Sequence, residues 1–166
     1  MAVHVRLAEP VDADAIGEVH AASWAEAYAP FFDAEFAVRG VEDRRVRWHQ
    51  RLAEGELTVL LAELDGAAAA LAVYSPSEER QGWAEIHSFY CHPERWGSGA
   101  SAELMAGTLR RTREEGSLGV HLWTLRDTPR SRRFYTKSGF TETGASRPRD
   151  FGDGKPLEQV EFAYRW

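Results

Sequence analysis

Hydrophobic and polar positions recur with two different periods along the chain, and these periods divide it into strands and helices. Residues 3–7 alternate at every second position, which predicts a short β-strand. Pro10 and Asp12 then open a helix in which Asp12 takes the N-cap position. The inward face of this helix is predicted from residues at three- and four-residue spacing, namely Ile16, Val19, Ser23 and Ala27.

A second helix is predicted over residues 42–54, because an arginine-rich pattern ends there at Gly55, a typical residue after a helix end. Val46 and Leu52 are its expected inward positions. The segment between the two helices holds a proline and two adjacent phenylalanines, and it is expected to be a loop.

The middle of the chain reads as a hairpin followed by a strand–helix–strand unit. Asp65-Gly66 is a typical two-residue hairpin turn between strands at residues 57–63 and 67–74. After a polar loop at residues 75–82, the remaining elements are expected at residues 84–91 (strand), 101–115 (helix, ended by Gly116) and 120–125 (strand). Two strands joined through a helix lie parallel with a right-handed crossover.

The sequence pattern of the last part of the chain predicts one helix and two strands. Thr128 is the N-cap and Pro129 the first residue of a helix that extends to residue 138. Strands are expected at residues 140–145 and 157–164, joined by a loop at residues 147–156. The whole pattern predicts one α/β domain over residues 1–166, with a mixed, mostly antiparallel sheet, a central βαβ unit and helices on both faces.

Composition and charge narrow the class of protein. A chain of 166 residues is long enough for one domain with a full core. Its net charge of −6 argues against general nucleic-acid binding. Cys91 is the only cysteine, so no intrachain disulfide can form, and no apolar run is long enough to span a bilayer. We expect a soluble cytoplasmic protein without a nucleic-acid or membrane partner. A homodimer is one possible oligomeric state.

The candidate chemistry lies after the strand at residues 84–91. Gly97 and Gly99 stand between the end of this strand and the start of the next helix. Glycines let the backbone approach an anion closely, and the free N–H groups at a helix N-terminus point toward it. This stretch therefore predicts a site for a phosphate or pyrophosphate.

The same stretch resembles the acetyl-CoA loop of the GCN5-related N-acetyltransferase (GNAT) family. That loop has an Arg/Gln-x-x-Gly-x-Gly/Ala pattern after a strand that ends in a His-Pro pair. Here His92-Pro93 is followed by Gly97-x-Gly99. Trp96 stands where the family usually has Arg or Gln, and Ser101 stands where it usually has Gly or Ala.

A second stretch, residues 122–140, looks like the family's strand, Asn-x-x-Ala-x-x-x-Tyr helix and Gly-Phe pair. Tyr135 and Gly139-Phe140 match this pattern, whereas Thr128 replaces the usual Asn and Ser131 the usual Ala. Both motifs occur in the family's order and at its separation.

The resemblance implies that an amine attacks acetyl-CoA directly, with acetyl-CoA as cosubstrate and a small molecule or peptide as the acceptor. Tyr135 would then be the general acid that protonates the departing thiolate. The implied cofactor-binding residues are Phe89, Tyr90, Cys91, Trp96, Gly97, Ser98, Gly99, Ala100, Ser101, Ala102 and Thr128. The basic residues of the second motif, which could attract the cofactor's phosphates or simply be solvated, are Arg126, Arg130, Arg132, Arg133 and Lys137.

The attacking amine must be neutral, so a base is needed. Glu85 and His87 are two residues apart on the predicted strand and therefore share a face. We take Glu85 as the catalytic candidate, with a solvated carboxylate as the alternative. By resemblance, Trp24 and Tyr28 line the acceptor site, and a place in the core is their alternative.

Other classes of protein remain as alternatives. Gly97-x-Gly99-x-x-Ala102 formally fits a dinucleotide fingerprint, but five residues separate the strand from its first glycine. A non-catalytic module that binds an acyl-CoA as a sensor or partner is a further alternative. The spacing of the histidines suggests no metal site, and no metal is expected.

Overall fold

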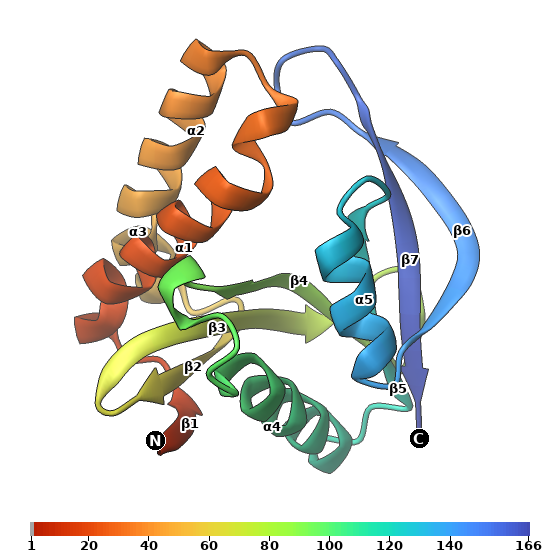
Figure 1. Cartoon of the computed structure of the whole chain (residues 1–166). Coiled ribbons are helices and arrows are strands. Elements are labelled where there is room, and N and C mark those ends of the chain that lie inside the picture. Colours follow the sequence, from red (N-terminus) through yellow and green to blue (C-terminus); the bar gives the residue numbers. More distant parts are fainter. Residues whose placement is uncertain (1) are drawn as a thin grey trace. The chain divides into compact units, whose positions relative to one another are not determined.

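The computed structural model describes residues 2–166 and shows an α/β chain with a seven-stranded mixed sheet (Figure 1). Its elements are β1 (Val3–Leu7), α1 (Ala13–Ala27), α2 (Ala34–Val46), α3 (Trp48–Glu54), β2 (Thr58–Leu64), β3 (Ala67–Pro76), β4 (Ala84–Cys91), α4 (Ala100–Glu114), β5 (Gly119–Leu125), α5 (Pro129–Lys137), β6 (Thr141–Arg149) and β7 (Leu157–Arg165). Hydrogen-bonded neighbours follow the order β1-β2-β3-β4-β5-β7-β6. The predicted fold class is confirmed.

The chain forms two compact units, and neither is one continuous segment. The first runs up to Ser75 and includes Ser88–Thr108, and the second combines Pro76–His87 with Leu109–Trp166. The boundaries pass through β4 and α4, so each of these elements contributes to both units. The single domain expected over the whole chain stays a prediction.

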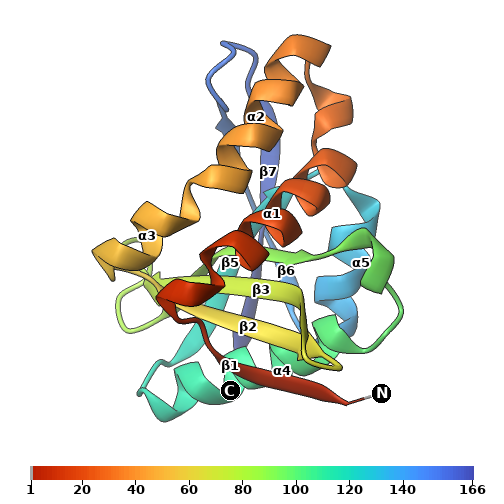
Figure 2. The same cartoon turned by 90° about the vertical axis from the view of Figure 1, so that its left-hand side faces the viewer.

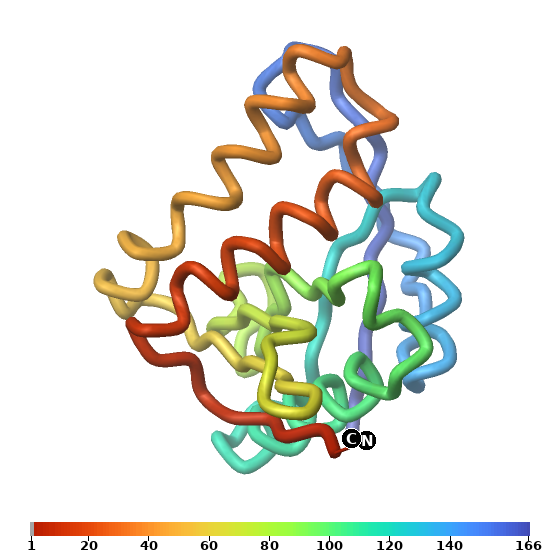
Figure 3. The backbone as a smooth tube through the Cα atoms, turned by 60° about the vertical axis from the view of Figure 1, so that its left-hand side comes forward, coloured from red at the N-terminus to blue at the C-terminus, as the bar shows by residue number. Residues whose placement is uncertain are grey.

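In the first unit, β1, β2 and β3 form an antiparallel sheet, and α1 and α2 run side by side in opposite directions (Figures 2 and 3). The predicted hairpin is confirmed, because Asp65 and Gly66 both have positive φ, at 51° and 84°. Buried apolar residues of α1, α3, β2 and β3 make up the core of this unit: Ala13, Ile16, Val19, Trp48, Val59, Leu61, Leu71 and Val73.

Asp12 is the N-cap of α1 by position, but its carboxylate makes no cap hydrogen bond to that helix. Both of its oxygens instead accept from the guanidinium of Arg6, at 2.8 and 2.9 Å, and one also accepts from the Glu9 N–H. The hydrogen bonds from Arg6 outweigh burial and lower the pKa of Asp12. This carboxylate therefore ties β1 to the start of the helix.

The prediction of one helix over residues 42–54 was wrong. Two helices, α2 and α3, occupy residues 34–54 and meet at Arg47, and only Gly55 ends the second as expected. Ala37 is the only buried residue of α2, so this helix carries almost no hydrophobic periodicity for a sequence pattern to detect. Val46 was predicted to face inward but is 58 % exposed, and Trp48 on α3 is buried instead.

His20 on α1 is buried in the first unit, where its Nδ1 accepts a hydrogen bond of 3.1 Å from Trp48 Nε1. Burial, with smaller contributions from the charges of nearby arginines, lowers the pKa of His20 to about 3. His20 is therefore neutral in the folded protein at moderately acidic pH, whereas it becomes charged in the unfolded chain.

We expect this histidine to make stability depend on pH. Below the ordinary pKa of 6.5 the unfolded chain binds one proton more than the folded chain. The contribution of His20 to the free energy of unfolding is therefore fully present above this pH. It falls by about 1.4 kcal/mol per pH unit as the pH drops toward 3. Urea unfolding between pH 7.5 and 4.5 measures the slope. His20→Asn, which keeps an acceptor for Trp48, should flatten it, and equal slopes in the two proteins would contradict the assignment.

In the second unit, β4 pairs with β5 in parallel through Ala84–Ile86, which confirms the predicted βαβ unit. β7 pairs antiparallel with both β5 and β6. β6 extends to Arg149, so the loop predicted at residues 147–156 is shorter than expected. The extension passes through Pro148, which is compatible with an edge strand because no further strand requires its missing N–H.

Candidate cofactor loop and active-site residues

The cofactor loop candidate lies in the first unit, between β4 and α4. After Cys91 a single 3₁₀ turn, Pro93–Arg95, is capped by His92, whose Nδ1 accepts from the Glu94 N–H. Gly97 and Gly99 follow with φ of 78° and 91°, values that favour glycine over residues with a side chain. The 3₁₀ turn separates the strand from the glycines, whereas a dinucleotide fingerprint has its first glycine in the tight turn itself.

The backbone of this loop leaves donors and space for an anion. The first intrahelical bond of α4 is Glu103 N–H to Gly99 O, at 3.1 Å, and the Ala100 N–H bonds to Ser98 Oγ. The N–H groups of Ser101 and Ala102 thus stand in the first turn, where the helix provides no acceptor. A Cβ added to Gly97 or Gly99 would meet no heavy atom within 4 Å. Binding of a pyrophosphate by these residues stays a prediction.

Tyr135 and Thr128 belong to the second unit. Thr128 is the N-cap of α5 by position, but its Oγ1 donates to Leu125 O at 2.7 Å and makes no cap bond to the helix. Tyr135 is buried, and its ring lies 5.9 Å from that of Phe140 and 5.8 Å from that of Phe162. The catalytic role of Tyr135 and the cofactor contact of Thr128 stay predictions.

Glu85 and His87 lie on one face of β4, as their spacing predicted, and their side chains contact each other. His87 Nδ1 lies 3.5 Å from a Glu85 carboxylate oxygen, and the two side chains are 37 % and 13 % exposed. Burial raises the pKa of the Glu85 carboxyl, but His87, His121 and Arg147 outweigh it and hold the pKa below its usual value. The carboxylate is therefore ionised at neutral pH and able to accept a proton.

The structure also brings together polar residues that the sequence pattern did not reveal, around the fully buried His121 of β5. Its Nε2 lies 2.6 Å from Ser77 Oγ, and its Nδ1 lies 2.8 Å from Glu161 Oε2. Glu161 also accepts two hydrogen bonds from Arg80. A histidine inside the mostly apolar strand β5 was the available signal. Only the strand register could have shown that they meet.

This His121 cluster has the connectivity of a catalytic Ser-His-Glu triad, but its hydroxyl is already engaged. Ser77 Oγ accepts hydrogen bonds from the N–H groups of both Glu79 and Arg80. Both of its lone pairs are therefore used to stabilise the loop after β3.

Glu79, His121 and Glu161 also place ligand atoms within 4.8 Å of one another, an arrangement of the kind that can hold a metal ion. However, Arg147 pairs with Glu79 and Arg80 with Glu161. A cation would have to compete with both guanidinium groups for these carboxylates.

Trp24 and Tyr28, the candidates for the acceptor site, lie near the end of α1 in the first unit. Trp24 is only 1 % exposed, and its ring stacks on Phe32 at 5.4 Å with the guanidinium of Arg44 over it. Tyr28 is half-buried and meets the ring of Tyr90 edge-on at 6.0 Å. Contact of these side chains with a substrate stays a prediction, and Trp24 also contributes to the packing of this unit.

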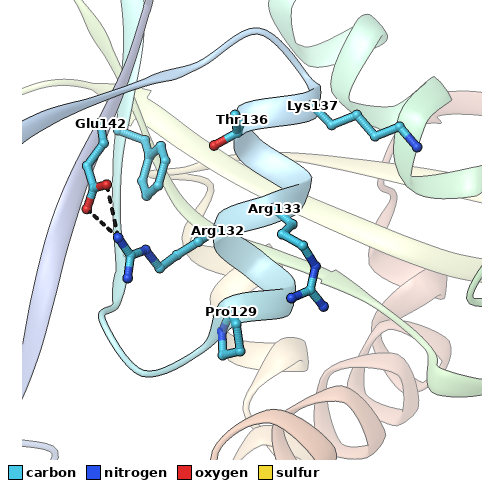
Figure 4. A pocket seen from close by; sticks show the side chains of 7 residues that line it. Pro129, Arg132, Arg133, Thr136, Lys137 and Glu142 are labelled. Atoms are coloured by element: carbon cyan, nitrogen blue, oxygen red, sulfur yellow. Dashed lines mark hydrogen bonds and ion pairs between the residues drawn. The ribbon is translucent and has the colours of Figure 1, made fainter.

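Three basic residues of α5, Arg132, Arg133 and Lys137, lie on two sides of that helix (Figure 4). Arg132 makes two hydrogen bonds to the Glu142 carboxylate, and Arg133 and Lys137 point away from this pair. All three basic residues border a hollow of about 580 Å³. Its lining residues are Pro129, Arg132, Arg133, Thr136, Lys137, Glu142 and Phe162. The charge of Arg132 is thus paired with the carboxylate of Glu142.

No helix among residues 2–166 combines the length and the apolar character needed to cross a membrane.

Comparison with known proteins identifies the family. The model of the acetyltransferase (GNAT) family matches residues 20–140. A protein of Mycobacterium tuberculosis named as an uncharacterized N-acetyltransferase is 29 % identical over 135 residues, which cover 80 % of this chain and 85 % of that protein.

Solved structures show the same fold. The PaiA N-acetyltransferase of Thermoplasma acidophilum, in complex with coenzyme A, has a TM-score of 0.76 and 19 % identity, covering 99 % of this chain and 100 % of that one. YncA of Salmonella typhimurium, with acetyl-CoA, has a TM-score of 0.69 and 22 % identity, covering 99 % and 94 %. Since the family model matches well over half of the sequence, this chain belongs to the GNAT family of acetyltransferases.

Proposed function

We propose that this protein transfers an acetyl group from acetyl-CoA to a primary amine of a small molecule or peptide. The observation that carries this proposal is the loop between β4 and α4. Gly97 and Gly99 adopt left-handed conformations there, directly before helix N–H groups that have no intrahelical acceptor. Family membership supports acetyl-CoA as the donor.

In the proposed reaction the amine nitrogen attacks the thioester carbonyl carbon, forming a C–N bond while the C–S bond breaks. Glu85 accepts the proton that the amine loses, directly or through water. Tyr135 donates its hydroxyl proton to the departing CoA thiolate. The products are the acetylated amine and CoA with a free thiol.

Two measurements test this function together. Calorimetry with acetyl-CoA and with NAD(P) tests the cofactor, and a panel of amines and peptides, followed by release of free thiol, tests the transfer. We expect binding of acetyl-CoA and amine-dependent release. Binding of NAD(P) alone would overturn the cofactor assignment, and acetyl-CoA binding without transfer to any amine would favour a sensor module.

Substitution of one glycine separates cofactor binding from folding. Gly99→Ala should weaken acetyl-CoA binding about tenfold or more, because the added Cβ occupies the space through which the pyrophosphate approaches the backbone. Gly116→Ala is the matched control, since this glycine has a φ of 93° and equally open surroundings. Both substitutions place an alanine in a left-handed conformation, so both should lower the free energy of unfolding by a similar ~1–2 kcal/mol. Equal affinities in the two folded variants would place the phosphates elsewhere.

A further inference from the structure

The peptide between Cys91 and His92 stands at the end of β4, immediately before the cofactor loop. The His92 N–H donates to Ala69 O on β3 at 2.8 Å. The C=O and N–H of one trans peptide point in opposite directions, so the Cys91 carbonyl faces away from β3. If pantetheine lies along β4 as an added strand would, its amide approaches this carbonyl.

Two side chains contact the Cys91 carbonyl oxygen. Trp96 Nε1, from the start of the loop, donates to it at 3.2 Å. Ser23 Oγ, from α1, lies 3.0 Å from it but only 2.6 Å from Val19 O. A hydroxyl has a single proton, so Ser23 shares one proton between two carbonyls, whereas the indole proton of Trp96 is directed at Cys91.

We propose that Trp96 is a positioning residue that holds the cofactor loop against the end of β4 through the Cys91 carbonyl. The inference rests on the proposed function and deepens it. Trp96 acts on the protein's own backbone, at the position where the family usually has Arg or Gln. When acetyl-CoA binds, the pantetheine amide N–H donates to the Cys91 carbonyl in place of Ser23, and Ser23 Oγ then donates only to Val19 O.

Such a brace matters because the loop is built on glycines. Gly97 and Gly99 have more conformational freedom in an unrestrained loop than other residues, and ordering them on binding would reduce affinity. A hydrogen bond that is already present in the free enzyme removes part of this cost. The indole is 37 % exposed, so its N–H bond to the strand end fixes a ring that neighbouring side chains only partly enclose.

Trp96→Phe tests the brace, because it keeps a ring and removes the N–H. We expect CoA and acetyl-CoA to bind about 2- to 10-fold more weakly, the effect of one net hydrogen bond, with turnover at saturating acetyl-CoA close to wild type. Ser23→Ala should bind at least as tightly as wild type. Trp123→Phe is the matched control, since it loses an indole bond to Glu79 in the second unit, and its affinity should not change.

A spectroscopic measurement separates the brace from a side chain that CoA displaces. The indole N–H signal of Trp96, assigned by its loss in Trp96→Phe, should stay protected from solvent exchange when CoA binds. Exposure of this proton by CoA, or unchanged or tighter binding by Trp96→Phe, would overturn the inference while leaving the proposed function intact. Failure of the wild-type protein to bind CoA would overturn both.

Discussion

Tyr135→Phe is expected to lower turnover by at least about 100-fold while acetyl-CoA still binds. The change removes only the hydroxyl, and a general acid typically contributes ~10²–10⁴-fold to a rate. Tyr135 stands seven residues after Thr128, close to two helical turns, so the two residues share a face of α5. Steady-state kinetics with a good acceptor, together with calorimetry for acetyl-CoA, measures both quantities.

Tyr164→Phe is the control for this experiment. Its ring lies 5.5 Å from that of Phe140, so it belongs to the same aromatic cluster as Tyr135, but neither family motif includes it. We expect it to turn over like wild type. If Tyr135 were only a core tyrosine, Tyr135→Phe would lose about 0.5–1.5 kcal/mol of stability with little change in turnover, and solvent would be the proton source.

Glu85→Gln is expected to have the second large effect, again a loss of at least about 100-fold in turnover, because glutamine cannot accept a proton. His87 and the other nearby groups hold the pKa of Glu85 below its ordinary value of 4.5, so the carboxylate is charged at neutral pH. A decline in kcat/KM caused by protonation of Glu85 should therefore appear only at pH values below 4.5.

His87→Gln distinguishes the two neighbours on β4. The variant loses the imidazole beside Glu85, and we expect a smaller decrease in turnover than for Glu85→Gln. The reverse order would make His87 the base. Near-normal turnover in both variants would mean that Glu85 is a solvated carboxylate and that water alone deprotonates the amine.

Local signals predicted the parts of the fold that depend on neighbouring residues. Asp65-Gly66 specifies its hairpin because both positions require positive φ. Gly97 and Gly99 identified the loop for the same reason. α2 escaped detection because it buries little, and its boundary with α3 depends on how Trp48 packs into the core.

The parts of the site that the sequence could not show depend on strand register. Glu85 lies opposite His121 in the parallel pair of β4 and β5, and Glu161 reaches the same histidine from β7. These residues are far apart in the chain, so no spacing rule connects them. The contact of Trp96 with Cys91 is local, but it depends on the direction of an indole side chain, which periodicity does not specify.

The interleaving of the two units has a consequence for synthesis of the protein. The first unit needs Ser88–Thr108, so it cannot close until that stretch has left the ribosome, although β1, β2 and β3 emerge earlier. The second unit needs β7, whose Arg165 pairs with Gly119, so it closes only after β7 has also left the ribosome. Nascent strands must therefore wait for distant partners, a situation in which exposed edges favour aggregation and chaperones are most useful.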